Sequence, residues 1–273
     1  MTNRSNVPVL VVNAFTDTLF GGNPAAVVET ETPLTDSTMQ SIAEQHNLSE
    51  TAFLVRKGVD HFYLRWFTPT KEVPLCGHAT LASAYALDYL RRWVGERLTF
   101  DTASGSLYVT RDGDQYRIEF PAVFMDEVET PSNVAAALGV SVVRSFQPSN
   151  GAWQMVCELA DEETLKACAP DFSALAKATD LGVSITAASS DVDYVSRFFI
   201  PQLGISEDPV TGSAHCQLVP FWAARLSKTT LRARQLSARG GDLNGTLSGD
   251  RVVLAGECCL FSEGRIFLPS AFV

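Results

Sequence analysis

Two glycine-centred turns, each running directly into an apolar segment, occur once in each half of the chain. The first turn spans residues 74–80 and continues into 81–87, and the second spans 208–215 and continues into 216–222. A helix that is apolar on all faces must be covered by other structure, here by sheet. The chain is therefore predicted to be an α+β protein with two similar halves, each a curved, mostly antiparallel sheet wrapped around one central helix.

The surroundings of the two turns also repeat. Arg197, in Arg-Phe-Phe-Ile-Pro, lies 132 residues after Arg65, in Arg-Trp-Phe-Thr-Pro, and Thr211 lies 135 residues after Cys76. Two matched segments that occur in the same order in both halves indicate an internal duplication. We expect a first half over residues 1–120 and a second over 121–273, with the C-terminal strand free to return to the first half.

Several further elements are predicted along the chain. Ser37 followed by Gln40 is a capping box, which predicts a helix that ends near Asn47. The first apolar helix is expected to extend to about Trp93. Short helices are expected over 133–138, ended by Gly139, and over 162–178, interrupted at Pro170. Strands are expected at 9–15, 25–28, 48–55, 62–67, 153–159 and 193–201.

Composition limits the class of protein. The 273 residues are 46% hydrophobic, and the formal net charge is −10 without any Lys/Arg-rich run, so neither nucleic acid nor an anionic membrane is an expected partner. The six cysteines have neither CxxC spacing nor the density of a disulfide scaffold. No apolar run is long enough for a transmembrane helix, and the N-terminus lacks a signal-peptide core. These features predict a cytoplasmic protein.

The starts of the two apolar helices are candidate anion-binding sites. Free N–H groups and the partial positive charge at a helix N-terminus favour an anion such as a carboxylate. Gly77, Gly212 and Ser213 lie at these starts. In the loop 16–24, Gly21 and Gly22 beside Asn23 let the backbone approach a ligand closely. A small carboxylated molecule is the expected partner.

Three ionisable residues are candidates for proton transfer. Glu50 lies in an otherwise apolar strand, where burial would disfavour its ionised form and suit it to a proton shuttle, although it could instead point to water. His78 follows Gly77, and the helix dipole is expected to keep its imidazole neutral unless the residue is only a cap or part of the core. Asp208, extended before Pro209, is a second acid/base group or a turn residue, and its neighbour Glu207 is expected to be solvated.

Other chemistry finds less support in the sequence. Cys76, at a helix N-terminus, is either an unusually acidic thiol or, as we prefer, a small buried residue. His215 is expected to pack or cap. The four histidines lack metal-ligand spacing, and neither nucleotide-binding glycine motifs nor a GxSxG elbow occur. Neither a metal nor a cofactor is predicted.

The combined motifs resemble one family. Asn13-Ala14-Phe15, Gly22-Asn23-Pro24, Leu48-Ser49-Glu50-Thr51, Cys76-Gly77-His78-Ala79-Thr80 and Asp208-Pro209-Val210-Thr211-Gly212-Ser213 are similar to the motifs of the phenazine-biosynthesis PhzF-like isomerases, over nearly the whole chain. The resemblance implies the diaminopimelate epimerase-like fold, an active site between the halves, isomerase chemistry without a cofactor in a biosynthetic setting, and a homodimer.

The same resemblance assigns residues to roles. It implies that Glu50 is the general acid/base, that His78 and Asp208 assist, and that Gly77, Gly212 and Ser213 hold the substrate carboxylate; Asn23 and Cys76 are expected to line the same site. Related epimerases use one cysteine in each turn, whereas this chain has Thr211 in the second. An epimerase or racemase that uses Cys76, and a catalytically silent protein that binds small acids, remain alternatives.

Overall fold

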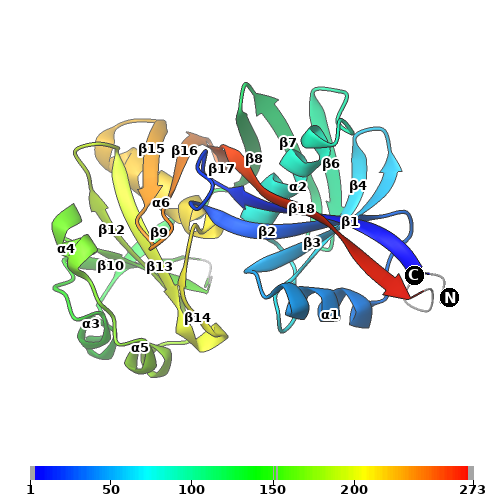
Figure 1. The fold of residues 1–273 in the computed structure, drawn as a ribbon. Coiled ribbons are helices and arrows are strands. Elements are labelled where there is room, and N and C mark those ends of the chain that lie inside the picture. Colours follow the sequence, from blue (N-terminus) through cyan, green and yellow to red (C-terminus); the bar gives the residue numbers. More distant parts are fainter. Residues whose placement is uncertain (1–3, 150, 152, 270–273) are drawn as a thin grey trace. The chain divides into compact units, whose positions relative to one another are not determined.

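The computed structural model describes residues 4–149, 151 and 153–269. The chain divides into two compact units, one of residues 1–119 with 255–273 and one of residues 120–254. The described residues form eighteen strands, six α-helices and one short 3-10 helix (Figure 1). Among these residues, no helix combines the length and the hydrophobicity that crossing a membrane requires.

The first unit is a sheet around helix α2. Its elements, in chain order, are β1 (Arg4–Ala14), β2 (Asn23–Thr30), α1 (Asp36–His46), β3 (Glu50–Gly58), β4 (His61–Phe67), β5 (Glu72–Val73), α2 (Gly77–Tyr89), β6 (Arg97–Thr102), β7 (Gly105–Asp112), β8 (Gln115–Pro121) and β18 (Cys258–Pro269). β1 pairs antiparallel with both β2 and β18, so the last strand belongs to this unit. β2–β3 and β4–β6 are parallel, and β3–β4, β4–β5, β6–β7 and β7–β8 are antiparallel.

Helix α2 is the centre of the first unit. It packs against β1, β2, β3 and β18, and every residue from His78 to Ala84 is buried. Its apolar sequence thus folds as predicted, but the expected extension to Trp93 is wrong. The helix ends at Tyr89, because Leu90 leaves helical geometry and Arg91 has a positive φ of 54°.

Helix α1 begins and ends at defined caps. The predicted Ser37 cap is wrong: Thr35 is the N-cap, and its hydroxyl accepts a hydrogen bond from the Thr38 amide at 3.2 Å. The helix ends as predicted at Asn47, which has a positive φ of 51°. This end places Glu50 at the first position of β3.

The second unit is a sheet around helix α6. Its elements are β9 (Met125–Val128), α3 (Ser132–Leu138), β10 (Arg144–Pro148), β11 (Gln154–Glu158), α4 (Glu162–Ala167), α5 (Phe172–Ala178), β12 (Gly182–Ala188), β13 (Tyr194–Ile200), η1 (Pro201–Leu203), β14 (Ile205–Asp208), α6 (Gly212–Leu226), β15 (Thr230–Gln235), β16 (Gly241–Ser248) and β17 (Arg251–Gly256). β11–β12 and β13–β15 are parallel; β9–β10, β10–β11, β12–β13, β13–β14 and β15–β16 are antiparallel. The short helices are confirmed, including the end of α3 at Gly139 and the interruption at Pro170.

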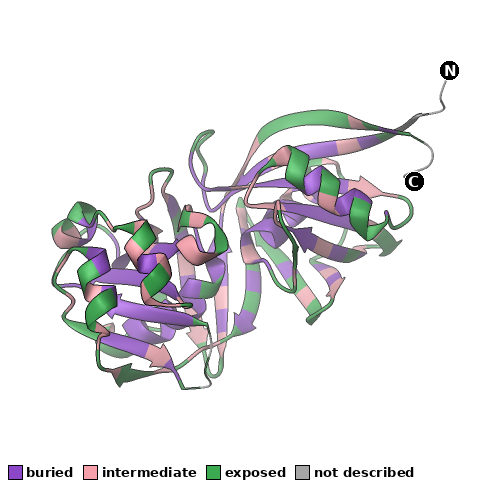
Figure 2. Cartoon of the chain, turned by 90° about the horizontal axis from the view of Figure 1, so that it is seen from below, coloured by how far each residue is buried: buried purple, intermediate pink, exposed green. Residues whose placement is uncertain are grey.

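Helix α6 is buried as α2 is. Its described core positions include all of Ala214 to Ala223. It packs on β15 and β16, where Gly245 is required: a Cβ at this position would lie 2.2 Å from Val219 Cγ2. Figure 2 shows buried positions along the strands, whereas the outer helices carry both buried and exposed positions.

Equivalent strands of the two units pair in the same order and register. β3 pairs with β4 through Thr51 and Phe67, and β12 pairs with β13 through Val183 and Phe199. In each unit the preceding strand runs parallel to the first of these two, and a short strand pairs with the second. The sequence repeat is therefore a repeat of structure, and the predicted α+β fold with two similar halves is confirmed.

Candidate active site

Glu50 projects from the start of β3 toward the start of α2. β3 lies between β2 and β4, and Glu50 is in register with Ala25 of β2. The Glu50 side chain is 14% exposed, and its Oε2 lies 3.1 Å from His78 Nε2. The carboxylate therefore faces a histidine rather than bulk water.

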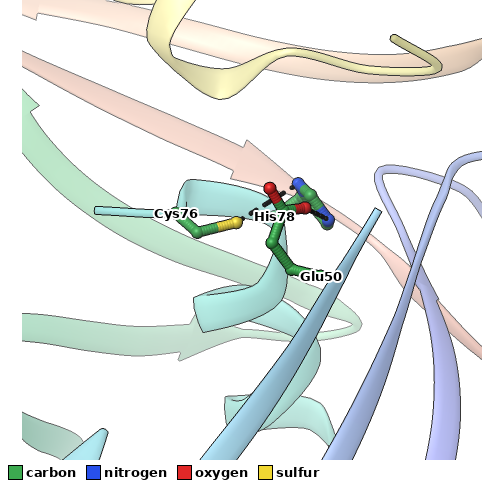
Figure 3. A group of neighbouring side chains, drawn as sticks. All are labelled: Glu50, Cys76 and His78. Carbon is green, nitrogen blue, oxygen red and sulfur yellow. Dashed lines mark hydrogen bonds and ion pairs between the residues drawn. The ribbon is translucent and has the colours of Figure 1, made fainter. Parts of the chain in front are cut away.

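Cys76 and His78 lie at the N-terminus of α2. Cys76 is the N-cap and forms no side-chain cap, so the first amides of the helix are not occupied by a capping side chain. Cys76 Sγ lies 3.5 Å from His78 Nδ1, and the His78 side chain is 7% exposed. In Figure 3, one dashed line joins the thiol to the imidazole and another joins the carboxylate to it.

The charges of this cluster determine which groups hold protons. Burial lowers the pKa of His78, but its interactions and hydrogen bonds with Cys76 and Glu50 outweigh burial and raise the pKa well above 6.5. Burial and the charge of Glu50 raise the pKa of the Cys76 thiol. The predicted neutral imidazole is wrong, because Cys76 and Glu50, the latter distant in sequence, both favour the protonated ring. The preferred reading of Cys76 as a small buried residue is confirmed, since burial also raises the pKa of its thiol.

Gly77 and Asn23 belong to the same unit. Gly77 is the first residue of α2, directly between Cys76 and His78. Asn23 is the first residue of β2 and is completely buried, opposite Ala14 of β1. The preceding residue, Gly22, has a φ of +65°, and a Cβ there would lie 2.3 Å from the Ala14 carbonyl oxygen. The loop thus depends on glycine, while contact of Asn23 with a substrate stays a prediction.

The second unit places Asp208 in a tight hydrogen-bonded turn before α6. The Thr211 hydroxyl donates to Asp208 Oδ2 at 2.5 Å. The buried Gln235 on β15 spans this turn: its Nε2 donates to the Asp208 carbonyl at 2.8 Å, and its Oε1 accepts from the Thr211 amide at 2.9 Å. Gln235 therefore fixes the backbone that carries Asp208.

Gly212 and Ser213 begin α6, as Gly77 and His78 begin α2. Ser213 is exposed, and its hydroxyl oxygen accepts a hydrogen bond from Gln154 Nε2 at 2.9 Å. Gln217 Nε2 in turn donates to Gln154 Oε1. Two buried glutamines thus orient the hydroxyl at this helix start.

Two neighbouring predictions have different outcomes. Glu207 is not solvated: both its carboxylate oxygens pair with the Arg197 guanidinium, at 2.7 and 2.9 Å. His215 packs as expected; it is buried, and its Nδ1 lies 2.8 Å from the Tyr194 hydroxyl. Burial lowers the pKa of His215 to about 4, so it is neutral near pH 7.

The positioning residues Gln154, Gln217 and Gln235 were missed. Gln154 and Gln217 are each a lone amide in a largely apolar stretch, which is a sequence signal for a buried polar contact, whereas Gln235 follows Arg234 and has no such signal. That signal does not identify the partner of each amide, because Gln154 and Gln235 lie in different elements from the residues that they orient.

The fold also brings together three side chains of types that can ligate a metal ion. One donor atom each from Glu50, Cys76 and His78 lies within 4.8 Å of the others. These residues come from β3, from the N-cap of α2 and from α2 itself. Sequence spacing cannot detect such a set, because the fold brings Glu50 to the other two.

A surface hollow lies elsewhere in the first unit. It has a volume of about 500 Å³ and is lined by Tyr85, Asp88, Tyr89, Arg91, Trp93, Arg111 and Tyr116. None of the predicted site residues contributes to it. The candidate site residues of the first unit lie at the start of α2, not in this hollow.

Known proteins share both the sequence and the fold. The chain is 48% identical to an uncharacterized isomerase of Pseudomonas aeruginosa over 94% of this chain and 97% of that protein. A crystal structure of a PhzF-family phenazine biosynthesis protein of Enterococcus faecalis is 43% identical, with a TM-score of 0.92 over 97% of this chain and 100% of that chain. A hydroxyproline epimerase of Agrobacterium vitis, 12% identical with a TM-score of 0.63 over 99% of this chain and 95% of that chain, shares the fold.

The family and the class of activity follow from these matches. The P. aeruginosa relative supports an isomerase, and the epimerase shares the fold of this chain. The pattern of the phenazine biosynthesis-like protein family matches residues 12–264. The chain belongs to the phenazine biosynthesis-like protein family.

Proposed function

We propose that this protein is a cofactor-independent isomerase that moves a proton on a small carboxylated substrate, with Glu50 as the general acid/base. The observation that carries the proposal is the pair of Glu50 and His78, 3.1 Å apart and largely buried at the start of an apolar helix. A carboxylate in contact with a buried imidazole has a partner that can exchange a proton with it. Family membership and the isomerase relative support the same class of chemistry.

Each remaining site residue has a proposed part. His78, with its raised pKa, stabilises the Glu50 carboxylate and can return a proton to it. The amides of Gly77, Gly212 and Ser213 bind the substrate carboxylate, since a helix N-terminus favours an anion. Asp208 assists proton transfer from the turn that Gln235 holds. Asn23 and Cys76 line the site.

The test measures hydrogen exchange rather than product alone. A panel of small carboxylic acids, including proline derivatives, is incubated with the protein in D₂O, and deuterium uptake at carbon is followed by NMR. We expect Glu50→Gln to lower the exchange rate by about 10²–10⁴-fold, because the amide cannot accept the proton. Binding should persist, since Gln keeps the shape of the side chain.

Glu29→Gln is the matched control. Glu29 is another largely buried carboxylate of the first unit, with a side-chain exposure of 10% and an ion pair to Arg92. This variant should keep the wild-type exchange rate. Full exchange in Glu50→Gln would remove Glu50 from the mechanism.

The same assay separates the alternatives. Cys76 lies 3.5 Å from His78 Nδ1, which makes a thiol-based epimerase the second candidate. In that case Cys76→Ser abolishes exchange, whereas under the Glu50 mechanism it retains a substantial rate. An acid that binds but never exchanges would identify a catalytically silent binding protein. A homodimer is part of the proposal and can be measured by light scattering.

A further inference from the structure

Glu50, Cys76 and His78 present three different ligand atoms at one place. A carboxylate oxygen, a thiol sulfur and an imidazole nitrogen lie within 4.8 Å of one another (Figure 3). They come from the start of β3 and the start of α2, two elements that pack together. The cluster is held by the fold rather than by one flexible loop.

The hydrogen bonding of the cluster leaves donor atoms available. Glu50 Oε2 and His78 Nε2 are buried, and within the described residues neither forms a well-directed hydrogen bond, although they lie 3.1 Å apart. Buried polar atoms in native proteins normally have a partner. Glu50 Oε2 and His78 Nε2 meet only in this ionic contact, and the thiol faces the other ring nitrogen, so a cation bound in the cluster would satisfy lone pairs that the protein leaves free.

The donor set matches one class of ion. Sulfur, imidazole nitrogen and carboxylate oxygen are the ligands of Zn²⁺, and three protein ligands with a free fourth position are typical of open zinc sites. Around a tetrahedral ion with bonds of about 2.0–2.3 Å, ligand atoms lie roughly 3.3–3.8 Å apart, so contraction by about 1 Å would complete the site. The carboxylate and a thiolate together neutralise a divalent ion, which reduces the cost of burying its charge.

We propose that Glu50, Cys76 and His78 form a binding site for a thiophilic divalent cation of the Zn²⁺ class. On binding, the Cys76 thiol and the protonated His78 imidazole each release one proton to solvent, and the sulfur and one ring nitrogen donate lone pairs to the cation, without any change of oxidation state. The bound cation occupies the Glu50 carboxylate and thereby prevents its exchange of protons. Only this inhibition rests on the proposed function, whereas binding of the cation does not.

The direct test is a Co²⁺ titration of the full chain, followed by absorbance. A thiolate bound to Co²⁺ gives a near-ultraviolet charge-transfer band, so the wild type should develop this band with saturation, and Zn²⁺ should displace it. Cys76→Ser should lose the band, and His78→Gln should weaken Co²⁺ affinity by at least about tenfold, the smallest effect expected from losing a ligand. Cys259→Ser, which removes a half-buried cysteine outside the cluster, should keep the band.

Two further measurements distinguish loss of metal binding from misfolding of a variant. Circular dichroism and thermal unfolding establish that each variant is folded. In the unmodified protein, Zn²⁺ should slow alkylation of Cys76, measured by mass spectrometry, and a chelator should restore it. A wild type without the band, a band kept in Cys76→Ser, or a band lost in Cys259→Ser would overturn the proposal.

The two proposals fail in different ways. If Co²⁺ binds but Glu50→Gln keeps full hydrogen exchange, the metal site stands and the isomerase mechanism is wrong. If exchange depends on Glu50 but the wild type gives no thiolate band, the mechanism stands and the metal site is wrong. Where both hold, Zn²⁺ should inhibit exchange in parallel with its displacement of Co²⁺.

Discussion

The two units share the same arrangement of strands and central helix but differ in their reactive side chains. Arg65 binds both oxygens of Glu72 in the first unit, and Arg197 binds both oxygens of Glu207 in the second. Each arginine also lies over a phenylalanine two residues later in its own strand. Contacts that hold the strand to the turn have thus been kept in both copies, which indicates that duplication preserved the scaffold.

The helix starts differ where chemistry is expected. Strand register makes Gly182 the counterpart of Glu50, and a Cβ at Gly182 would lie 2.4 Å from Phe198 Cζ, so no side chain fits there. The second unit carries its acid at Asp208 instead, whose counterpart in the first unit is Val73. A shared scaffold therefore offers a carboxylate at a strand start in one copy and in a turn in the other.

The largest expected effect is a difference in stability between variants of the two arginine–glutamate pairs. Arg197 and Glu207 have side chains 13% and 17% exposed, whereas Arg65 and Glu72 are 36% and 37% exposed. Arg197→Ala leaves a buried carboxylate without its partner and should reduce the free energy of unfolding by about 3–5 kcal/mol. Arg65→Ala should cost about 1 kcal/mol or less, because solvent screens an exposed pair. Urea unfolding measures both.

A double-mutant cycle tests the cause of that difference. Adding Glu207→Gln to Arg197→Ala removes the uncompensated charge and should restore part of the lost stability. Arg197 also donates to the Cys168 carbonyl at 2.6 Å, so recovery should be incomplete. Equal losses for the two arginine variants would show that the pairs are equivalent despite their different burial.

Acid should destabilise the protein through His215, whose counterpart in the first unit is Thr80. The folded-state pKa of about 4 lies below the unfolded value of 6.5, so the unfolded state binds the proton more tightly. Stability from this group is complete above pH 6.5 and is lost as pH falls toward 4. Between pH 8 and pH 5 the loss should be about 2 kcal/mol.

The comparison with His215→Gln isolates this contribution. The variant keeps the other titrating groups, so the difference between its pH dependence and that of the wild type reports on His215 alone. Unfolding midpoints in urea at pH 8 and pH 5 provide the measurement. Identical pH dependence in the two proteins would show that His215 does not carry the acid sensitivity.

The two similar halves and their central helices could be predicted, because their sequence pattern occurs twice in the chain. The apolar runs of α2 and α6 and the match of Arg65 with Arg197 predicted two similar halves and their central helices. The pairing of Glu207 was also within reach, since Glu72 and Glu207 occupy matching places before the two glycine turns. The prediction of a solvated Glu207 considered the residue alone and not its counterpart.

The protonation and hydrogen bonding of the site residues could not be predicted, because they depend on contacts between segments that are distant in sequence. His78 was expected to be neutral from its place at a helix start, a local feature, but Cys76 and the distant Glu50 on β3 together reverse that effect. Gln235 reaches the Asp208 turn from β15, and neither residue's sequence neighbours reveal the other. Local patterns predict elements, whereas the charge and hydrogen bonding of a site require the register of the strands.

The smallest effect concerns a hydrogen bond that both units retain. Ser104 donates to the Pro74 carbonyl at 2.8 Å, and Ser237 donates to the Pro209 carbonyl at 2.8 Å, so each bond ties the loop after one strand to the turn before a central helix. Ser104→Ala should cost about 0.5 kcal/mol, because the residue is exposed, and Ser237→Ala about 1 kcal/mol, because its oxygen also accepts from the Gly240 amide. Urea unfolding of the two variants compares them directly. A loss above about 2 kcal/mol for Ser104→Ala alone would mean that the turn before α2 depends on this bond more than the turn before α6, which Gln235 also holds.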